Sequence, residues 1–211
     1  MSSNRPILYH APRTTSSAIL WLINEIEETG LKNYFIIKTI NLQNGENKKK
    51  EYLKINPHGT VPTFISEEGI VITEFSSIIL LLSSKYTQYH SLNPTSLEKF
   101  FQWIVYSNSL HENIMKIIRE LIFNQNENIN LTEENLEKLR IRLGFIEKNL
   151  GDLKFMSDEK FTSIDIALGF NLFWVHQIDE LKNFEKLSKY FDVLKKRKSF
   201  ILTFKKESIL E

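Results

Sequence analysis

The nine residues from Asn56 to Phe64, NPHGTVPTF, place two prolines and a glycine directly before an apolar segment. Pro57 is expected to end any preceding helix, because the residue before a proline is pushed out of the helical region. Gly59 permits a positive φ angle, which suits a tight turn. Pro62 stands at the mouth of a predicted strand, where its missing N–H leaves a neighbouring main chain free to pair outward. The stretch therefore predicts a turn with a free main-chain edge, which is a place to hold a peptide.

The segments on either side of this turn alternate between strand and helix patterns. Short runs of β-branched and aromatic residues predict strands, and apolar residues spaced by three and four predict helices. The predicted elements are strands at Ile7–Tyr9 and Tyr34–Ile40, a helix at Ser16–Thr29, a short helix ending near Ile55, two strands around the Glu67-Glu68-Gly69 turn and a helix beginning near Glu74. The order β-α-β-α-β-β-α suits a sheet that is covered by helices.

The second part of the chain carries helical patterns throughout. Polar residues at 85–93 predict a linker between a domain at 1–84 and an all-helical domain at 94–211. The pattern predicts a long helix around residues 101–121, a second one around 136–150 and a late one around 184–194. Lys195–Lys198 is interpreted as the cationic end of a helix, where positive charge complements the helix dipole.

A helix-capping pattern begins at Thr162 in this second part. The Thr162 hydroxyl is placed to accept from the main-chain N–H of residue 165, and the Asp165 carboxylate to accept from the N–H of residue 162. The two side chains therefore predict a capping box, and replacing Asp165 by alanine is expected to destabilise the protein whatever its function.

The composition is that of an ordinary globular protein. The chain has 211 residues, of which 42% are hydrophobic, and a formal net charge of +1. A dedicated binder of nucleic acid or of a membrane surface would usually carry a basic excess. The N-terminus lacks the apolar core of a secretory signal, and the apolar run Ile78–Leu82 is far too short to span a bilayer. We therefore expect a cytoplasmic protein that binds neither nucleic acid nor membrane.

Cysteine is absent from the sequence. Disulfides, thiolate zinc sites and cysteine nucleophiles are therefore excluded. Because no other metal-ligand constellation and no glycine loop for phosphate is visible, any chemistry must come from hydroxyls, histidines, carboxylates or the backbone.

Two motifs together resemble those of the cytosolic glutathione S-transferases. The first is Asn56-Pro57-x-Gly59-x-Val61-Pro62, and the second is Ile72-Thr73-Glu74-x-Ser76-x-Ile78. The resemblance implies an N-terminal thioredoxin-like domain, a C-terminal helical bundle and a homodimer. It also implies a cis bond before Pro62, with the main chain of Val61 paired to the cysteinyl backbone of glutathione.

The sequence departs from the family pattern beside Glu74. In the family, a Glu-Ser or Asp-Ser pair and a helix N-terminus bind the γ-glutamyl carboxylate of glutathione. Here Glu74 matches, but the Phe75 side chain has no hydroxyl, so Ser76 or Ser77 would have to substitute. Losing one hydrogen bond to a charged group costs about 1.5–3 kcal/mol, so binding is expected to weaken. This departure is the strongest sequence argument against an active transferase.

Three hydroxyls before the first predicted helix are candidates for holding the glutathione sulfur as a thiolate. They are Thr14, Thr15 and Ser16. In similar serine-type members the hydroxyl falls near Thr14, and the cysteine of beta-class members falls near Thr15. The same residues also suit a simple helix cap, and the two roles can coexist.

Four other candidate residues are assigned to the glycyl end of glutathione and to the substrate pocket. Lys54 and His58 could meet the glycyl carboxylate of glutathione, or be solvated. Tyr9 and His111 are assigned to the substrate pocket, with a structural histidine as the alternative for His111. The resulting prediction is a transferase that directs glutathione thiolate, as co-substrate, at small apolar electrophiles, with peroxidase or isomerase activity left open. The alternative is a non-catalytic binding module, resembling the stringent-starvation type that docks on RNA polymerase.

Overall fold

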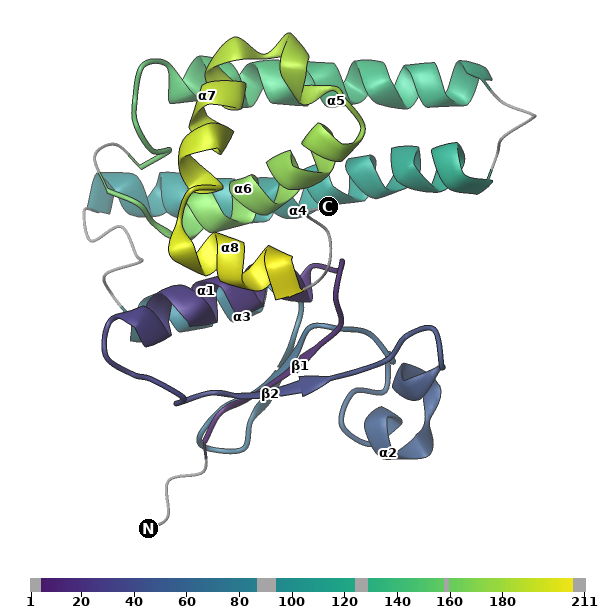
Figure 1. Cartoon of the computed structure of the whole chain (residues 1–211), viewed down its shortest axis with the longest axis vertical. Coiled ribbons are helices and arrows are strands. Elements are labelled where there is room, and N and C mark those ends of the chain that lie inside the picture. Colours follow the sequence, from purple (N-terminus) through teal and green to yellow (C-terminus); the bar gives the residue numbers. More distant parts are fainter. Residues whose placement is uncertain (1–4, 87–93, 124–128, 158–159, 207–211) are drawn as a thin grey trace. The chain divides into compact units, whose positions relative to one another are not determined.

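The computed structural model describes residues 5–86, 94–123, 129–157 and 160–206 (Figure 1). The chain folds into two compact units. The first comprises Met1–Tyr86 and Lys196–Glu211, and the second comprises Thr87–Lys195. Most of the predicted linker, residues 87–93, lies outside the described residues.

The first unit is built on a four-stranded sheet in the order β2-β1-β3-β4. Strand β1 pairs parallel with β2 and antiparallel with β3, which in turn pairs antiparallel with β4. The elements are β1 (Ile7–His10), α1 (Ser16–Glu28), β2 (Ile36–Thr39), the 3-10 helix η1 (Glu46–Lys48), α2 (Lys50–Leu53), β3 (Thr63–Ile65), β4 (Val71–Thr73) and α3 (Phe75–Lys85). The predicted order of strands and helices is confirmed, and so is the thioredoxin-like class.

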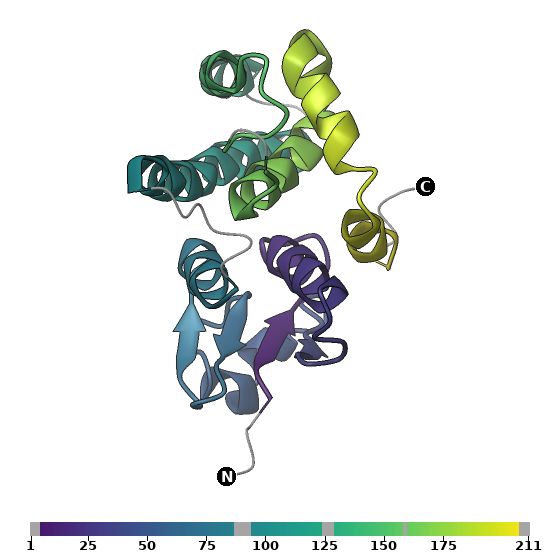
Figure 2. The same ribbon diagram turned by 90° about the vertical axis from the view of Figure 1, so that its left-hand side faces the viewer.

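The two faces of this sheet bury different side chains, because neighbouring residues of a strand point to opposite sides. Leu8 and Phe64 are paired across β1 and β3 and are both fully buried. Helices α1 and α3 lie together on one side of the strands (Figure 2). Tyr9 points to a second cluster that includes Tyr52 of α2, and their ring centroids are 5.4 Å apart.

The C-terminal helix α8 (Lys198–Lys206) packs on α1 of the first unit. Trp21 of α1 is fully buried and meets Phe200 edge to face at 5.0 Å. Arg197 forms a bidentate ion pair with the buried Glu25, at 2.6 and 2.7 Å. The interpretation of Lys195–Lys198 as a helix end missed this helix: α7 ends at Leu194 and α8 begins at Lys198. The predicted domain ranges, 1–84 and 94–211, stay a prediction, since a compact unit need not coincide with a domain.

The second unit is helical in its described part. Its elements are α4 (Pro94–Phe123), α5 (Ile129–Leu150), α6 (Ser163–Gln177), the 3-10 helix η3 (Leu181–Asn183) and α7 (Glu185–Leu194). The predicted capping box at the start of α6 is confirmed. Asp165 is fully buried and accepts from the N–H groups of Thr162 and Met156 and from the Tyr190 hydroxyl, at 2.6–2.9 Å.

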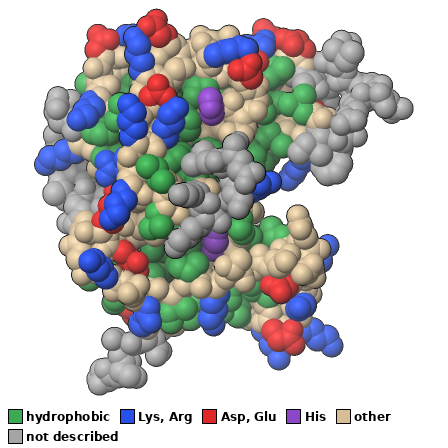
Figure 3. Space-filling view, in the orientation of Figure 1, with side chains coloured by type: hydrophobic (Ala, Val, Ile, Leu, Met, Phe, Trp, Pro, Cys, Tyr) green, Lys and Arg blue, Asp and Glu red, His purple; other side chains and the backbone are tan. Residues whose placement is uncertain are grey.

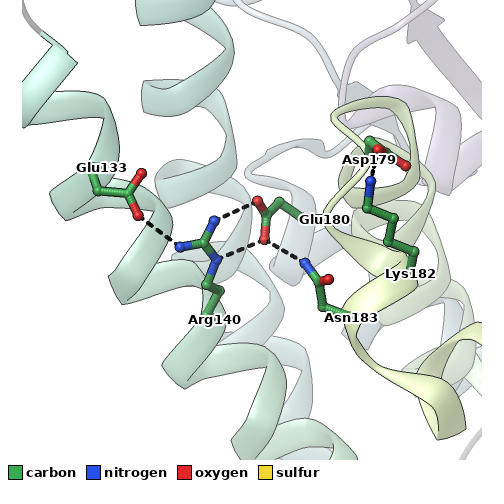
Figure 4. A network of polar contacts seen from close by, with 6 residues as sticks. All are labelled: Glu133, Arg140, Asp179, Glu180, Lys182 and Asn183. Atoms are coloured by element: carbon green, nitrogen blue, oxygen red, sulfur yellow. Dashed lines mark hydrogen bonds and ion pairs between the residues drawn. The ribbon is translucent and has the colours of Figure 1, made fainter.

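An ion-pair network ties α5 to the turn after α6 (Figure 4). Arg140 donates two hydrogen bonds to Glu180, at 2.8 and 2.9 Å, and a third to Glu133 at 2.8 Å. Glu180 also accepts a hydrogen bond from the side-chain amide of Asn183. The Glu180 carboxylate is therefore held by two groups, the planar guanidinium of Arg140 and the amide of Asn183.

Charged side chains of both signs are interspersed on the face drawn in Figure 3, among the residues that the structure describes. In the same described part of the chain, no helix has the combination of length and apolarity that a membrane crossing needs.

Candidate functional site

The loop between α2 and β3 is held in place by the buried side chain of Asn56. Its amide nitrogen donates to the Thr60 carbonyl and to the Thr63 hydroxyl, both at 2.9 Å. Its carbonyl oxygen accepts from the main-chain N–H of His58 at 3.0 Å. The partners' chemistry fixes the orientation of the amide, because a carbonyl can only accept and an N–H can only donate.

Tyr52 and Gly59 hold the same loop from the side of α2. The Tyr52 hydroxyl donates to the Thr60 carbonyl at 2.6 Å and lies 2.9 Å from the Thr63 hydroxyl. Burial raises the pKa of Tyr52, which therefore stays a neutral donor. Gly59 has φ +63°, and a Cβ atom there would come within 2.9 Å of the Asn47 carbonyl oxygen. The glycine is therefore required both by the turn and by the close approach of η1.

The held loop presents the main chain of Val61. The Val61–Pro62 peptide bond is cis, as the resemblance implies. Pro62 is buried and Val61 is half-buried. Among the described residues, no hydrogen bond to the main chain of Val61 is found, whereas the Thr60 carbonyl beside it accepts from both Tyr52 and Asn56. The main-chain edge at Val61 is available to an external partner.

The sheet register brings three further segments to this edge. Thr63 pairs with Tyr9 in β1 and with Thr73 in β4, both antiparallel. Because both pairings are antiparallel, the residue before Thr63 in β3 lies beside the residue after Tyr9 in β1 and the residue after Thr73 in β4. Pro62 therefore lies at the same end of the sheet as His10 and Glu74. The end of β1, the cis peptide and the start of α3 therefore share one end of the sheet.

Helix α3 begins at this end with main-chain donors. Its first hydrogen bond runs from the Ile78 N–H to the Glu74 carbonyl, and the N–H groups of a first helical turn point toward the N-terminus of the helix. Such donors and the helix dipole favour an anion. Glu74 is exposed with φ 69°, a conformation that is rare outside glycine. Phe75 is buried, whereas Ser76 is half-buried.

The three candidate hydroxyls before α1 differ in exposure. Ser16 is fully buried, and its hydroxyl oxygen contacts His10, Ala11 and Thr14. Thr14 and Thr15 are half-buried, and Thr15 makes no capping hydrogen bond with its side chain. Two of the three residues are therefore partly exposed, whereas Ser16 belongs to the interior.

The remaining candidates of the first unit are split between surface and core. Lys54 and His58 are both exposed, at the end of α2 and in the held loop. Tyr9 is only 7% exposed, stacks edge to face on Tyr52 and carries the Lys38 ammonium 5.4 Å from its ring centroid. Its ring is therefore part of the core under α2.

His111 belongs to α4 of the second unit. Its Nδ1 lies 3.2 Å from the amide oxygen of Asn171, and its ring lies against Phe170 with centroids 5.3 Å apart. Burial lowers the pKa of His111 to about 4, against the smaller opposing effect of the Asn171 hydrogen bond. The imidazole is therefore neutral near pH 7, in agreement with the structural alternative for this residue.

Two residues of the site were missed by the sequence analysis. His10 was not predicted as a candidate, although it is a polar residue directly after the apolar strand residues 7–9. Asn56 was recognised as part of a motif, but not as the residue that anchors the loop. The described residues contain no group of three His, Asp or Glu side chains that could hold a metal ion.

Comparisons with known proteins agree with this geometry. Residues 19–85 match the family model of the glutathione S-transferase N-terminal domain, and residues 110–198 match that of the C-terminal domain. Glutathione S-transferase D7 of Anopheles gambiae is 25% identical over 167 residues, which are 77% of this chain and 73% of that protein.

Two solved structures share the fold. A glutathione transferase family member from Pseudomonas fluorescens, with two glutathione molecules bound, has a TM-score of 0.86 at 16% identity and covers 96% of this chain and 93% of its own. The nitrogen regulation fragment of the yeast prion protein Ure2p has a TM-score of 0.83 at 17% identity, and the match covers 97% and 98% of the two chains. Because the two family models together match most of the sequence, the chain belongs to the glutathione S-transferase family.

Proposed function

We propose that the chain binds glutathione on its first compact unit and directs the glutathione thiolate at a small apolar electrophile. The observation that carries the proposal is the register around Thr63, which puts the free main chain of Val61 and the start of α3 at one end of the sheet. A tripeptide with a charged end can use both features at once. Its extended main chain pairs with the main chain of Val61, and its carboxylate binds at the N-terminus of α3.

The proposed roles follow the chemistry of each residue. The main chain of Val61 pairs with the cysteinyl backbone of glutathione. Glu74 and the first N–H groups of α3 hold the γ-glutamyl end, where the carboxylate of the protein meets the ligand amine and the N–H groups meet the ligand carboxylate. Lys54 and His58, both exposed on the neighbouring loop, supply positive charge or hydrogen bonds for the glycyl carboxylate.

Thiol activation is assigned to the half-buried hydroxyls of Thr14 and Thr15. A thiolate is the reactive form, and a thiol pKa near 8.5 leaves only a few per cent of it at pH 7. Lowering that pKa by two units takes about 2.7 kcal/mol of differential stabilisation. One hydrogen bond to the charged sulfur, made at the start of α1, supplies an amount of this order.

Structural neighbours support the ligand assignment. The Pseudomonas fluorescens protein contains two bound glutathione molecules, and Ure2p has been crystallised in complex with glutathione. The same resemblance extends the proposal to a cytoplasmic homodimer, for which light scattering in solution is the measurement of oligomeric state. Peroxidase or isomerase activity on the same thiol remains compatible with this site.

A second candidate function is a non-catalytic binding module. Phe75 favours it, because a buried phenyl ring stands where the family supplies a serine hydroxyl. The loss of that hydrogen bond is worth about 10- to 150-fold in affinity for glutathione. The likeness to the nitrogen regulation fragment of Ure2p is compatible with this reading.

A thermal-shift titration with glutathione separates the two functions. Saturation at about 100 times the dissociation constant stabilises a protein by about 2.7 kcal/mol, which raises the melting temperature by about 5–10 °C for a chain of this size. We expect the Glu74→Ala variant to lose this shift. Turnover of an aryl halide with glutathione is measured in parallel.

The matched control is Glu68→Ala. Glu68 is an exposed carboxylate in the turn before β4, whereas Glu74 follows that strand, so the two carboxylates lie at opposite ends of it. The control is expected to keep the ligand-induced shift. No stabilisation of the wild-type protein at millimolar glutathione would refute the transferase and leave the binding module; a shift without turnover of any electrophile would favour the module as well.

A further inference from the structure

Helix α1 is buried around more than half of its circumference. Trp21 and Ile23 are both buried, and residues two positions apart point about 200° apart around a helix. The buried stripe of a helix that covers only one face of a sheet is typically about 100° wide. Within the first unit α1 packs on β1 and α3, so its wider burial requires a further partner.

The further partner is α8, which comes from the other end of the sequence (Figure 1). The rings of Phe200 and Phe204 lie with centroids 4.3 Å apart, and both meet Trp21 edge to face, at 5.0 and 6.3 Å. The side-chain amide of Asn24 donates to the hydroxyl of Thr203, which is fully buried, at 2.8 Å. The contact between the two helices therefore has an aromatic centre and a matched polar pair.

A buried carboxylate makes this contact depend on α8 being in place. Glu25 of α1 is only 3% exposed and accepts from Arg197, the residue before α8, at 2.6 and 2.7 Å. The indole N–H of Trp21 donates to the same carboxylate at 3.1 Å. A buried charge that loses a hydrogen-bonded partner is strongly destabilised. Removing the guanidinium therefore favours a state in which α8 has left α1 and water reaches Glu25.

The start of the same helix carries the hydroxyls assigned to the glutathione thiol. The carbonyls of Thr14 and Thr15 accept the first main-chain hydrogen bonds of α1, from the N–H groups of Ser17 and Ala18, at 2.9 and 3.2 Å. Both threonines therefore move with the helix. Trp21 follows Thr15 by only about 9 Å along the helix axis, at about 1.5 Å per residue. A shift of α1 under α8 is thus carried to the threonines, because a helix moves as a rigid element.

We propose that α8 is a clasp, a helix whose docking on α1 is coupled to the binding of glutathione. The inference rests on the proposed function and adds a means of regulating the same site. Docking fixes α1, and a fixed α1 holds Thr14 and Thr15 at hydrogen-bond distance from the sulfur of the ligand. The coupling is reciprocal: the factor by which undocking of α8 weakens glutathione binding is the factor by which glutathione favours docking.

Hydrogen exchange of the wild-type protein, with and without saturating glutathione, tests the coupling. Amide hydrogens of α8 exchange when this helix opens locally. Glutathione slows that exchange only if the opened state binds glutathione more weakly than the docked state. We expect the amides of α8 to exchange about 5- to 150-fold more slowly in the complex, the usual range of coupling between two sites. Helix α7 of the second unit is the internal control and should be slowed less.

Arg197→Ala provides the second measurement. This variant should open α8 more often and raise its exchange rate by about 10- to 100-fold, and glutathione should slow the faster exchange again. The matched control is Lys198→Ala. Lys198 is in the same helix and pairs with Glu28 at 3.1 Å, but its side chain is 83% exposed. Its loss should leave the exchange of α8 nearly unchanged.

Three outcomes would overturn the inference. One is a protein that binds glutathione, by thermal shift, while the exchange of α8 stays the same. Another is equal slowing of α7 and α8, which reports global stabilisation without a clasp. The third is an Arg197→Ala variant in which glutathione no longer slows α8. If that variant does not fold, the wild-type comparison decides alone. A wild-type protein without any thermal shift in glutathione refutes the proposed function itself, and the clasp with it.

Discussion

Replacing Asn56 tests whether one buried amide holds the loop that presents Val61. The side chain is fully buried, and its nitrogen faces only oxygen atoms: the Thr60 carbonyl, the Thr60 hydroxyl and the Thr63 hydroxyl, at 2.9–3.2 Å. Asn56→Ala removes these contacts and the bond from the His58 N–H. Asn56→Asp keeps the volume and the His58 bond but turns the nitrogen into an oxygen that faces other oxygens.

The magnitude follows from which partners lose their hydrogen bonds. After Asn56→Ala, the Thr60 carbonyl and the Thr63 hydroxyl still contact Tyr52, so they are not orphaned. At about 1 kcal/mol net for each of the four hydrogen bonds, the loss in free energy of unfolding is about 4 kcal/mol. Asn56→Asp is also expected to lower the free energy of unfolding at pH 7, because it buries a carboxylate and places one of its oxygens against the Thr60 carbonyl oxygen.

Urea denaturation at pH 7 measures both variants, with glutathione affinity as the second readout. The matched control is Glu51→Ala, whose exposed side chain lies on the neighbouring helix α2 and whose loss should change the free energy of unfolding by less than about 0.5 kcal/mol. An Asn56→Asp variant as stable as the wild type would show that the amide does not hold the loop.

Three further predictions concern the second unit. Asp165→Ala should lower the free energy of unfolding by about 3–4 kcal/mol in urea, because buried donors at the start of α6 lose their acceptor; a loss below about 1 kcal/mol would contradict this. His111 has a pKa of about 4 in the fold against 6.5 for the free side chain, so the unfolded state binds more protons between these values. Stability should therefore fall on acidification from pH 6.5 toward pH 4, by up to about 1.4 kcal/mol per pH unit, and His111→Gln should flatten that slope in urea titrations. Arg140→Ala breaks the bidentate pair with Glu180 and should cost about 1 kcal/mol, whereas Lys138→Ala, whose ion pair is exposed at both ends, should cost less than about 0.5; equal effects would refute the ranking.

The sequence by itself determined the order of the elements and the location of the held loop. Periodicity, glycine and proline act within a few residues, and the NPHGTVP stretch combines several such local signals. The capping box at Thr162 was predictable for the same reason, since both partners lie within one helical turn. The family resemblance then carried the cis bond before Pro62, which spacing alone does not predict.

Only the tertiary structure decided which of the candidate side chains are buried. Thr14, Thr15 and Ser16 look equivalent in the sequence, yet Ser16 is buried against His10 and the two threonines are not. The packing of α8 on α1 was equally invisible, because the pair of Glu25 and Arg197 joins residues 172 positions apart. Such contacts depend on how elements meet in space, and a local pattern that fixes a helix leaves open which of its neighbours covers each side chain.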